Sequence, residues 1–210
     1  MTSMGVYTRP MTVELLTEAP LAPPAGLGPY RREDYDALPD QPRCELLYGR
    51  LYVTPSPTPW HQMVALYLWR HLESIAAATG GFAFGAPLDT VLADHSVVQP
   101  DVIYVSATRL AVLGKRIEGA PDLVIEVLSP GSVRHDRGGK LRLYAEAGVR
   151  EYWIVDPETR QVEFLVNEAE RFVVLLPDPD GVYRSEQIPE IHLDVAEFWR
   201  EVERRSPPGR

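Results

Sequence analysis

The sequence is poor in cysteine, since Cys44 is the only one among 210 residues. A disulfide within the chain is therefore excluded, and without a CxxC pair or clustered histidines a structural zinc site is not expected. The chain also lacks a run of about 18 apolar residues, the length that a membrane-spanning helix needs. Its first residues show no signal-peptide pattern. We therefore expect a cytoplasmic protein with no membrane contact.

Positive charge is also scarce, because 21 Lys and Arg residues face 30 Asp and Glu, for a net charge of -9. Tight, non-specific binding of nucleic acid usually requires a basic surface. A metal-dependent nuclease remains compatible with this charge, because a bound cation partly neutralises the carboxylates of its site. A short stretch of the sequence is nevertheless rich in basic residues that are suited to contacts with phosphates: Arg134, Arg137, Lys140 and Arg142.

The composition indicates one domain with short extensions, because 45% hydrophobic and 24% charged residues are ordinary for a globular protein. Residues 1–29 are rich in proline and predict a flexible arm, which contains a short apolar stretch of Val13, Leu15 and Leu16. Residues 30–203 form the predicted domain. Residues 204–210 are a polar tail.

Hydrophobic periodicity predicts a mixture of helices and strands within this domain. Helices are expected at 31–38, 58–78, 108–113, 136–147 and 194–203, and strands at 44–47, 50–53, 82–84, 88–92, 97–105, 122–128, 151–155, 162–166 and 172–176. The strand–helix–strand unit at 122–155 favours a parallel crossover, whereas the other strand pairs read as antiparallel hairpins. The fold class is therefore α/β, a mixed sheet flanked by helices with additional antiparallel hairpins.

Glu126 is the most informative residue, because it interrupts a strand that is otherwise apolar on both faces. A carboxylate in that position costs several kcal/mol unless it is paired, protonated or bound to a metal. Asp122 lies on the same face, but four residues of strand separate the two by roughly 13 Å, too far to share one ion. A partner for Glu126 must come from another element.

Asp101 is the best candidate partner, since it begins another mainly apolar strand and neighbouring strands lie about 4.8 Å apart. Facing carboxylates at that spacing can hold one divalent cation, which lowers the pKa of a coordinated water. The helix after Glu126 offers Lys140 as a cation near that water. The alternative is a buried ion pair of Glu126 with Lys140 or Arg142.

The order Pro100-Asp101, Glu126-x-Leu128 and Lys140 resembles the PD-(D/E)XK nuclease superfamily, which has the restriction-endonuclease-like fold. The stretch GAPDLVIEVLSPGSVRHDRGGKLRLYAEAGVREYWIVDP is similar to a large bacterial family classed as restriction endonucleases, most of them of unknown function. The similarity extends from about residue 30 to about residue 198. Leu128 departs from the superfamily pattern, which has a lysine at that position of the strand.

The resemblance implies that Asp101, Glu126 and the carbonyl of Val127 bind Mg²⁺ or Mn²⁺, and that Lys140 replaces the strand lysine. It also implies a role in the site for Glu45, which otherwise reads as a charge on an edge strand. The accessory candidates are His61, Gln99 and Asp136, and the candidates for nucleic-acid contact are Arg134 and Arg137. The alternative for His61 is a histidine that packs near Trp60 at the start of a helix, whereas the side chain of Gln99 is expected to project near the metal.

Two functions follow from these patterns. The first is a metal-dependent endonuclease that hydrolyses phosphodiester bonds in double-stranded DNA, as a homodimer that cuts both strands. The second is a catalytically inactive module of the same fold that binds nucleic acid or a protein partner, which Leu128 and the net charge favour.

Overall fold

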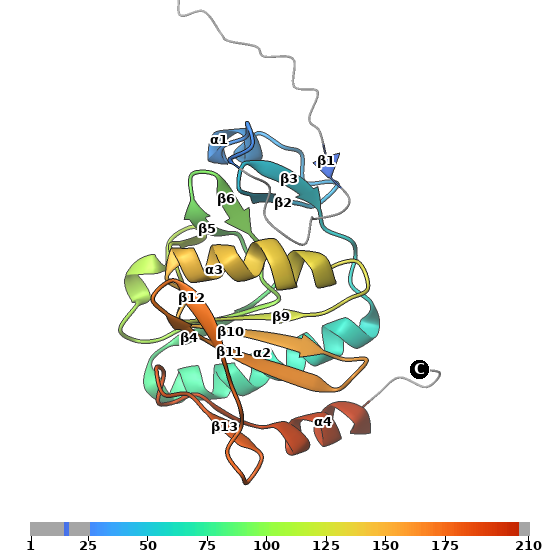
Figure 1. The fold of residues 1–210 in the computed structure, drawn as a ribbon, viewed down its shortest axis with the longest axis vertical. Coiled ribbons are helices and arrows are strands. Elements are labelled where there is room, and N and C mark those ends of the chain that lie inside the picture. The colour runs from blue at the N-terminus through green and yellow to red at the C-terminus, as the bar shows by residue number, and fades with distance from the viewer. Residues whose placement is uncertain (1–14, 17–25, 206–210) are drawn as a thin grey trace, which may run out of the picture.

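The computed structural model describes residues 15–16 and 26–205. Its strands form two six-stranded sheets and one two-stranded ribbon. Helices lie on both faces of the second six-stranded sheet described below (Figure 1). This arrangement confirms the α/β class and the mixed sheet. The predicted arm and tail lie largely outside the described residues, but Gly28 already donates a backbone hydrogen bond of 2.7 Å to the carbonyl of Tyr48.

The first sheet has the order β1-β3-β2-β6-β5-β8 and holds the predicted hairpin. Its strands are β1 (Leu15–Leu16), β2 (Cys44–Leu47), β3 (Arg50–Val53), β5 (Thr90–Ala93), β6 (Ser96–Val98) and β8 (Ile117–Glu118). Strand β1 pairs in parallel with β3 of its own chain. Helix α1 (Arg32–Asp36), shorter than predicted, lies beside this sheet, packed through Tyr35 on the core of β2, β3, β5 and β6.

The second sheet has the order β12-β11-β10-β9-β7-β4. Its strands are β4 (Phe82–Gly85), β7 (Val102–Val105), β9 (Leu123–Val127), β10 (Glu151–Asp156), β11 (Gln161–Glu168) and β12 (Arg171–Leu175). Strands β9 and β10 are parallel and the other pairs are antiparallel, so the prediction of a parallel crossover is confirmed.

Helices cover both faces of the second sheet (Figure 1). Helix α2 (Pro59–Thr79) packs Val64 and Leu68 against the face of Ile125 and Val127, and helix α3 (Leu141–Ala147) covers the opposite face. Helix α2 begins and ends as predicted. The Thr58 hydroxyl accepts a hydrogen bond from the amide of His61, and Gly80 ends the helix with a φ of 80°.

The C-terminal region closes the face that α2 occupies. Helix α4 (Val195–Arg204) begins near Asp194 as predicted. The Asp194 side chain caps it, and the helix packs Phe198 and Val202 into the same core. The ribbon of β13 (Val182–Arg184) and β14 (His192–Asp194) was not predicted, because each strand has only three residues and no clear alternation. The same holds for β1 and β8, with two residues each.

The prediction of one continuous strand at 97–105 is wrong. The chain leaves the first sheet after β6, turns at Gln99, Pro100 and Asp101, and enters the second sheet as β7. Pro100 has no amide hydrogen for a sheet ladder, which explains why the strand breaks there. The break has a functional consequence, because it sets Asp101 at the junction of the two sheets.

The prediction of one α-helix at 136–147 is also wrong in its first half. Residues His135–Lys140 form a π-helical segment, η2, which precedes α3. Gly139 allows this wider turn to approach β2, since a Cβ added there would lie 2.5 Å from Cδ2 of the buried Leu47. The helix expected at 108–113 is likewise reduced to a 3-10 turn, η1 (Leu110–Val112).

Candidate active site

One cavity of about 250 Å³ opens where the two sheets meet, and the predicted residues gather on its wall. It is lined by Glu45, His61, Gln99, Asp101, Glu126, Val127, Asp136 and Lys140, together with His135 and Arg43. Arg134 and Arg137 do not line it. The cavity therefore unites residues that are up to 97 positions apart, from 43 to 140, in the sequence.

The register of β7 and β9 brings Asp101 and Glu126 together. Val102 pairs with Ile125 in this antiparallel ladder, so the next pair outward is Asp101 and Glu126. Paired residues of adjacent strands lie about 4.5–5.5 Å apart. The carboxylate of Asp101 is fixed there, because its Oδ2 accepts a hydrogen bond of 2.8 Å from the amide of Val127.

Lys140 lies at the centre of the carboxylates. Its Nζ is 2.8 Å from Oε1 of Glu126, 2.9 Å from Oε1 of Glu45 and 3.7 Å from Oδ1 of Asp136. All four side chains are buried. Lys140, from η2, thus forms the buried ion pair with Glu126 that the sequence analysis gave as the alternative to a metal site. The alternative pairing with Arg142 is wrong, since Arg142 is exposed and pairs with Glu146.

One lysine does not balance three carboxylates, and the pKa values reflect this. Burial tends to raise the pKa of Glu45, but Lys140 and His135 hold it well below its usual range. Burial raises the pKa of Glu126 well above its usual range; the charge of Lys140 opposes this shift, and the charges of Asp136 and Asp101 add to it. Burial tends to lower the pKa of Lys140, but the carboxylates raise it well above its usual range.

Glu126 uses one oxygen for its contacts with the protein. Its Oε1 accepts hydrogen bonds from Nζ of Lys140 and from the hydroxyl of Tyr144, the latter at 2.7 Å. Tyr144 stands one helical turn after Lys140, so α3 and η2 hold the carboxylate from the same side. The second oxygen, Oε2, is not used by these contacts.

Two histidines flank the carboxylates. Nε2 of His61, at the start of α2, lies 3.2 Å from Oδ2 of Asp101, and Nε2 of His135 lies 3.3 Å from Oε2 of Glu45. Burial tends to lower the pKa of His61, but Asp101 raises it above its ordinary value. His135 reads in the sequence as a loop histidine and was not among the candidate site residues, although it stands beside Asp136 and one π-helical turn before Lys140.

Gln99 reaches the site through its backbone. Its amide donates a hydrogen bond of 2.6 Å to Oε1 of Glu45, whereas its side-chain amide points away, to Asp89 at 2.9 Å and to Tyr35 at 3.3 Å. The expectation that the Gln99 side chain projects toward a metal is therefore not supported by its contacts. The residue fixes Glu45 instead.

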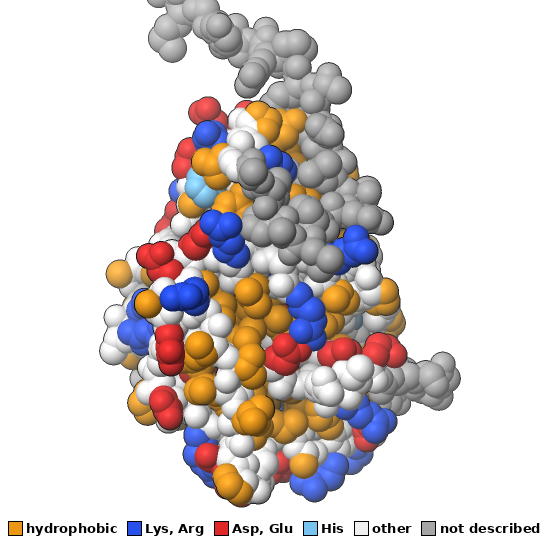
Figure 2. Space-filling model, viewed as in Figure 1, with side chains coloured by type: hydrophobic (Ala, Val, Ile, Leu, Met, Phe, Trp, Pro, Cys, Tyr) orange, Lys and Arg blue, Asp and Glu red, His pale blue; other side chains and the backbone are white. Residues whose placement is uncertain are grey.

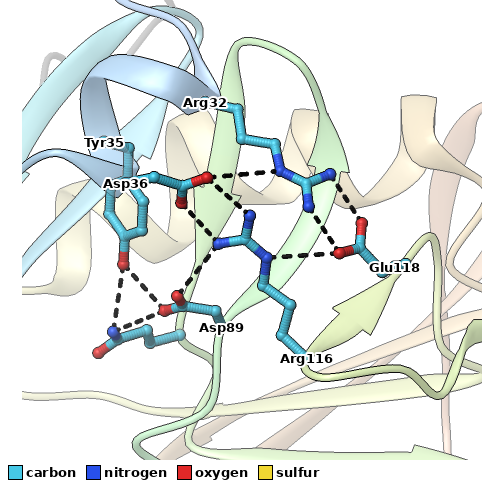
Figure 3. Close-up of polar contacts among 7 residues, drawn as sticks. Arg32, Tyr35, Asp36, Asp89, Arg116 and Glu118 are labelled. Atoms are coloured by element: carbon cyan, nitrogen blue, oxygen red, sulfur yellow. Dashed lines mark hydrogen bonds and ion pairs between the residues drawn. The ribbon is translucent and has the colours of Figure 1, made fainter.

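A network of ion pairs near the surface lies beside the contacts of the Gln99 side chain (Figure 3). Arg116 pairs with Asp36 at 2.7 Å and with Asp89 at 3.6 Å, and Arg32 pairs with Glu118 at 2.7 Å. Because these pairs connect α1 with β8 and with the residues before β5, they hold Asp89 where it receives the Gln99 amide. Networks of several charges stabilise more than isolated surface pairs do.

The basic residues around the cavity differ in their availability. Arg137 forms a bidentate salt bridge with Glu163, which raises the pKa of Arg137. Arg134 is exposed. Arg43, which the sequence analysis missed, lines the cavity, and its buried Nε has no hydrogen-bond partner among the described residues. A phosphate oxygen would satisfy this atom.

A divalent cation fits the cavity by charge. Four carboxylates (Glu45, Asp101, Glu126 and Asp136) face two cations, Lys140 and Arg43. Within residues 15–16 and 26–205, no three His, Cys, Asp or Glu side chains are arranged to hold a metal ion by themselves. Mg²⁺ is commonly held by one or two carboxylates while it keeps several waters. Asp101 and Glu126 are two carboxylates of the cavity that the register of β7 and β9 places opposite each other.

The chain is similar to known proteins both in sequence and in structure. The profile of the family described as "Uma2: Putative restriction endonuclease" matches residues 32–196. A crystal structure described as "a putative nuclease belonging to DUF820" from Anabaena variabilis ATCC 29413 is similar in fold. Its TM-score is 0.68 at 20% sequence identity, and the match covers 83% of this chain and 99% of that one. No curated protein matches the sequence significantly.

None of the helices within the described residues has the length and apolar character to cross a bilayer. The family match spans every residue of the cavity, from Arg43 to Lys140. The fold is that of the restriction-endonuclease-like superfamily, and the chain belongs to the Uma2 family.

Proposed function

We propose that this protein is a metal-dependent endonuclease that hydrolyses phosphodiester bonds in DNA, with Mg²⁺ or Mn²⁺ as cofactor. The observation that carries the proposal is the placement of Asp101 and Glu126 on adjacent strands with Lys140 at 2.8 Å from Glu126. This is the residue chemistry that the superfamily resemblance requires, although the lysine comes from η2 rather than from β9.

Each residue has a part in the proposed reaction. Asp101, Glu126 and the Val127 carbonyl hold the cation, which when bound supplies positive charge to the phosphate and lowers the pKa of water. Lys140 stabilises the attacking hydroxide or the negative charge that develops on phosphorus. Glu45 keeps Lys140 charged and oriented, and His61 keeps Asp101 in place.

Substrate phosphates need cations at the mouth of the cavity. Arg43 is positioned for the phosphate being cleaved, because it lines the cavity and its Nε is unpaired among the described residues. Arg134 and Arg137 would contact phosphates further along the strand, with Arg137 exchanging Glu163 for the substrate. Such contacts make binding weaken as salt concentration rises.

Incubation with supercoiled plasmid tests the proposal. We expect nicked and then linear plasmid with Mg²⁺ or Mn²⁺, and no conversion in EDTA, because the carboxylates alone do not activate water. Absence of cleavage of double-stranded DNA, single-stranded DNA and RNA with every divalent metal would contradict the proposal.

The alternative, an inactive module of the same fold, rests on Leu128 in place of the strand lysine. Lys140 weakens this argument, since its ammonium lies beside Glu126. Calorimetry separates the two functions. For an inactive module, Glu126→Gln should leave any binding of Mn²⁺ unchanged, whereas for a metal-dependent nuclease it should abolish the binding.

We further propose that the protein forms a homodimer, so that two sites can cut both strands of a duplex. Strand β12 is an edge of its sheet, and Val174 and Leu176 are 56% and 83% exposed. Figure 2 shows hydrophobic side chains gathered on the face that carries α3 and β12. Unpaired edge strands readily pair with another chain. Equilibrium sedimentation should give a dimer at tens of micromolar, which Leu176→Lys weakens, whereas a monomeric wild type would contradict it.

A further inference from the structure

A second cavity of about 250 Å³ adjoins the candidate active site. Its wall is formed by Gln62, Ala65, Leu66, Trp69, Gly85, Ala86 and Asp101. Gln62, Ala86 and Asp101 also line the first cavity. A molecule whose phosphate lies near Asp101 can therefore place a neighbouring group in this second cavity, which we call the side pocket.

The walls of the side pocket are apolar and partly aromatic. Leu66 and Trp69 stand three residues apart on α2 and so share one face of the helix. Leu66 is 57% exposed, so its side chain is accessible to a ligand. Trp69 is held in place, because its Nε1 donates a hydrogen bond of 3.1 Å to the carbonyl of Ala83. The pocket thus presents a rigid aromatic ring beside an exposed aliphatic side chain.

The width of the pocket depends on a glycine. A Cβ at Gly85 would lie 3.8 Å from the carbonyl oxygen of Asp101 and 4.0 Å from Cδ1 of Trp69. These are ordinary contact distances, so a larger side chain there would occupy the pocket without a clash in the backbone. Position 85 therefore offers a way to fill the pocket while the fold is kept.

The chemistry of the walls favours a flat, largely apolar group with a polar edge. Gln62 supplies an amide that both donates and accepts hydrogen bonds. The charged side chain of the wall is the carboxylate of Asp101, which repels a phosphate. At about 250 Å³ the pocket is smaller than the roughly 300–1,000 Å³ that whole small ligands occupy, so it suits one part of a substrate.

We propose that the side pocket binds a nucleobase of the substrate, next to the phosphate that the divalent cation at Asp101 and Glu126 would hold. This inference rests on the proposed nuclease function and adds to it a requirement on the substrate. A base inside a duplex is stacked and paired, so it reaches such a pocket only from a single strand or after it is turned out of the helix. The preferred substrate is therefore DNA with an unpaired nucleotide beside the scissile bond.

Nucleotide binding tests the proposal without relying on cleavage. The probes are the four deoxynucleoside 5′-monophosphates and deoxyribose 5-phosphate, each with Mg²⁺, because none of them contains a phosphodiester bond. The side-chain N–H signal of Trp69, assigned with Trp69→Phe, reports binding by NMR titration. We expect the base to increase affinity about tenfold, as stacking on aromatic side chains does.

Variants locate the effect. Gly85→Val and Leu66→Ser should remove most of the affinity gained from the base and leave binding of deoxyribose 5-phosphate unchanged. Leu110→Ser is the matched control, because Leu110 is also exposed, at 38%, and lies on η1 outside both cavities. It should bind nucleotides as the wild type does.

The outcomes separate this inference from the proposed function. Equal affinity for nucleotides and deoxyribose 5-phosphate, or nucleotide affinity unaffected by Gly85→Val and Leu66→Ser, would overturn the side pocket even if plasmid is cut. Base-dependent binding that these two variants remove supports the pocket even if no plasmid is cut, in which case only the nuclease function fails.

Discussion

Replacing Lys140 with methionine is expected to abolish cleavage and to lower the melting temperature by about 10 °C. Lys140 is a buried cation within 4 Å of three buried carboxylates, Glu45, Glu126 and Asp136. Removing one partner of a buried ion pair costs about 3–5 kcal/mol, and each kcal/mol shifts the melting temperature of a domain this size by about 2–4 °C. Thermal unfolding and plasmid cleavage measure the two effects.

Divalent metal should reverse the loss of stability but not the loss of cleavage. A cation at Asp101 and Glu126 offsets the negative charge that Lys140 leaves behind, and a ligand at 100 times its Kd stabilises the folded state by about 2.7 kcal/mol. Arg142→Met is the control, because Arg142 is exposed and pairs only with Glu146 among the described residues. It should keep cleavage within about tenfold. Full activity of Lys140→Met would remove Lys140 from the mechanism.

Replacing Glu126 with glutamine is expected to have opposite effects on activity and stability. The amide keeps the shape of the side chain but loses the charge that holds a cation. A metal contributes several kcal/mol to the stabilisation of the transition state, so cleavage should fall at least about a hundredfold. The melting temperature should stay the same or rise, because one of the crowded carboxylates is neutralised.

The sign of the stability effect follows from the pKa of Glu126. Burial and neighbouring carboxylates raise it above the value in the unfolded chain, so at neutral pH ionisation of Glu126 favours the unfolded state. A purely structural ion pair with Lys140 predicts the opposite, a large loss of stability in Glu126→Gln. The two interpretations therefore differ in the direction of the change in melting temperature.

Glu151 provides a matched control for Glu126. It is fully buried on the adjacent strand β10, but it accepts a hydrogen bond of 3.1 Å from Nε1 of Trp153 and lies outside the cavity. Glu151→Gln should therefore leave cleavage unchanged. Equal losses of cleavage in the two variants would indicate that Glu126 acts only through the fold.

The central carboxylate was predictable because burial of a charge leaves a clear mark in a sequence. Glu126 interrupts the apolar strand β9, and the same reasoning led to Asp101 and Lys140. Fold class and the parallel pair of β9 and β10 were predictable from periodicity and chain order. These features depend on interactions that are close in sequence or on general rules of sheet topology.

Other parts of the site depend on tertiary geometry that periodicity does not encode. The break at Pro100 was hidden in an apolar run, yet it places Gln99 against Glu45 and Asp101 against Val127. The π-helical segment was read as ordinary helix, so the contact of His135 with Glu45 was missed. Arg43 carried no sequence signal, because its importance lies in the cavity that it faces.

A crystal of the protein soaked with Mn²⁺ tests the metal site most directly, because anomalous scattering locates the ion independently of activity. We expect an anomalous peak at about 2.0–2.2 Å from a carboxylate oxygen of Asp101 and of Glu126, with the Val127 carbonyl beside it, since hard cations of this size take oxygen ligands at such distances. The peak should be absent in Glu126→Gln. A fully soaked crystal with no peak between Asp101 and Glu126, from protein that cuts plasmid in Mn²⁺, would contradict the assignment of these residues as the metal site.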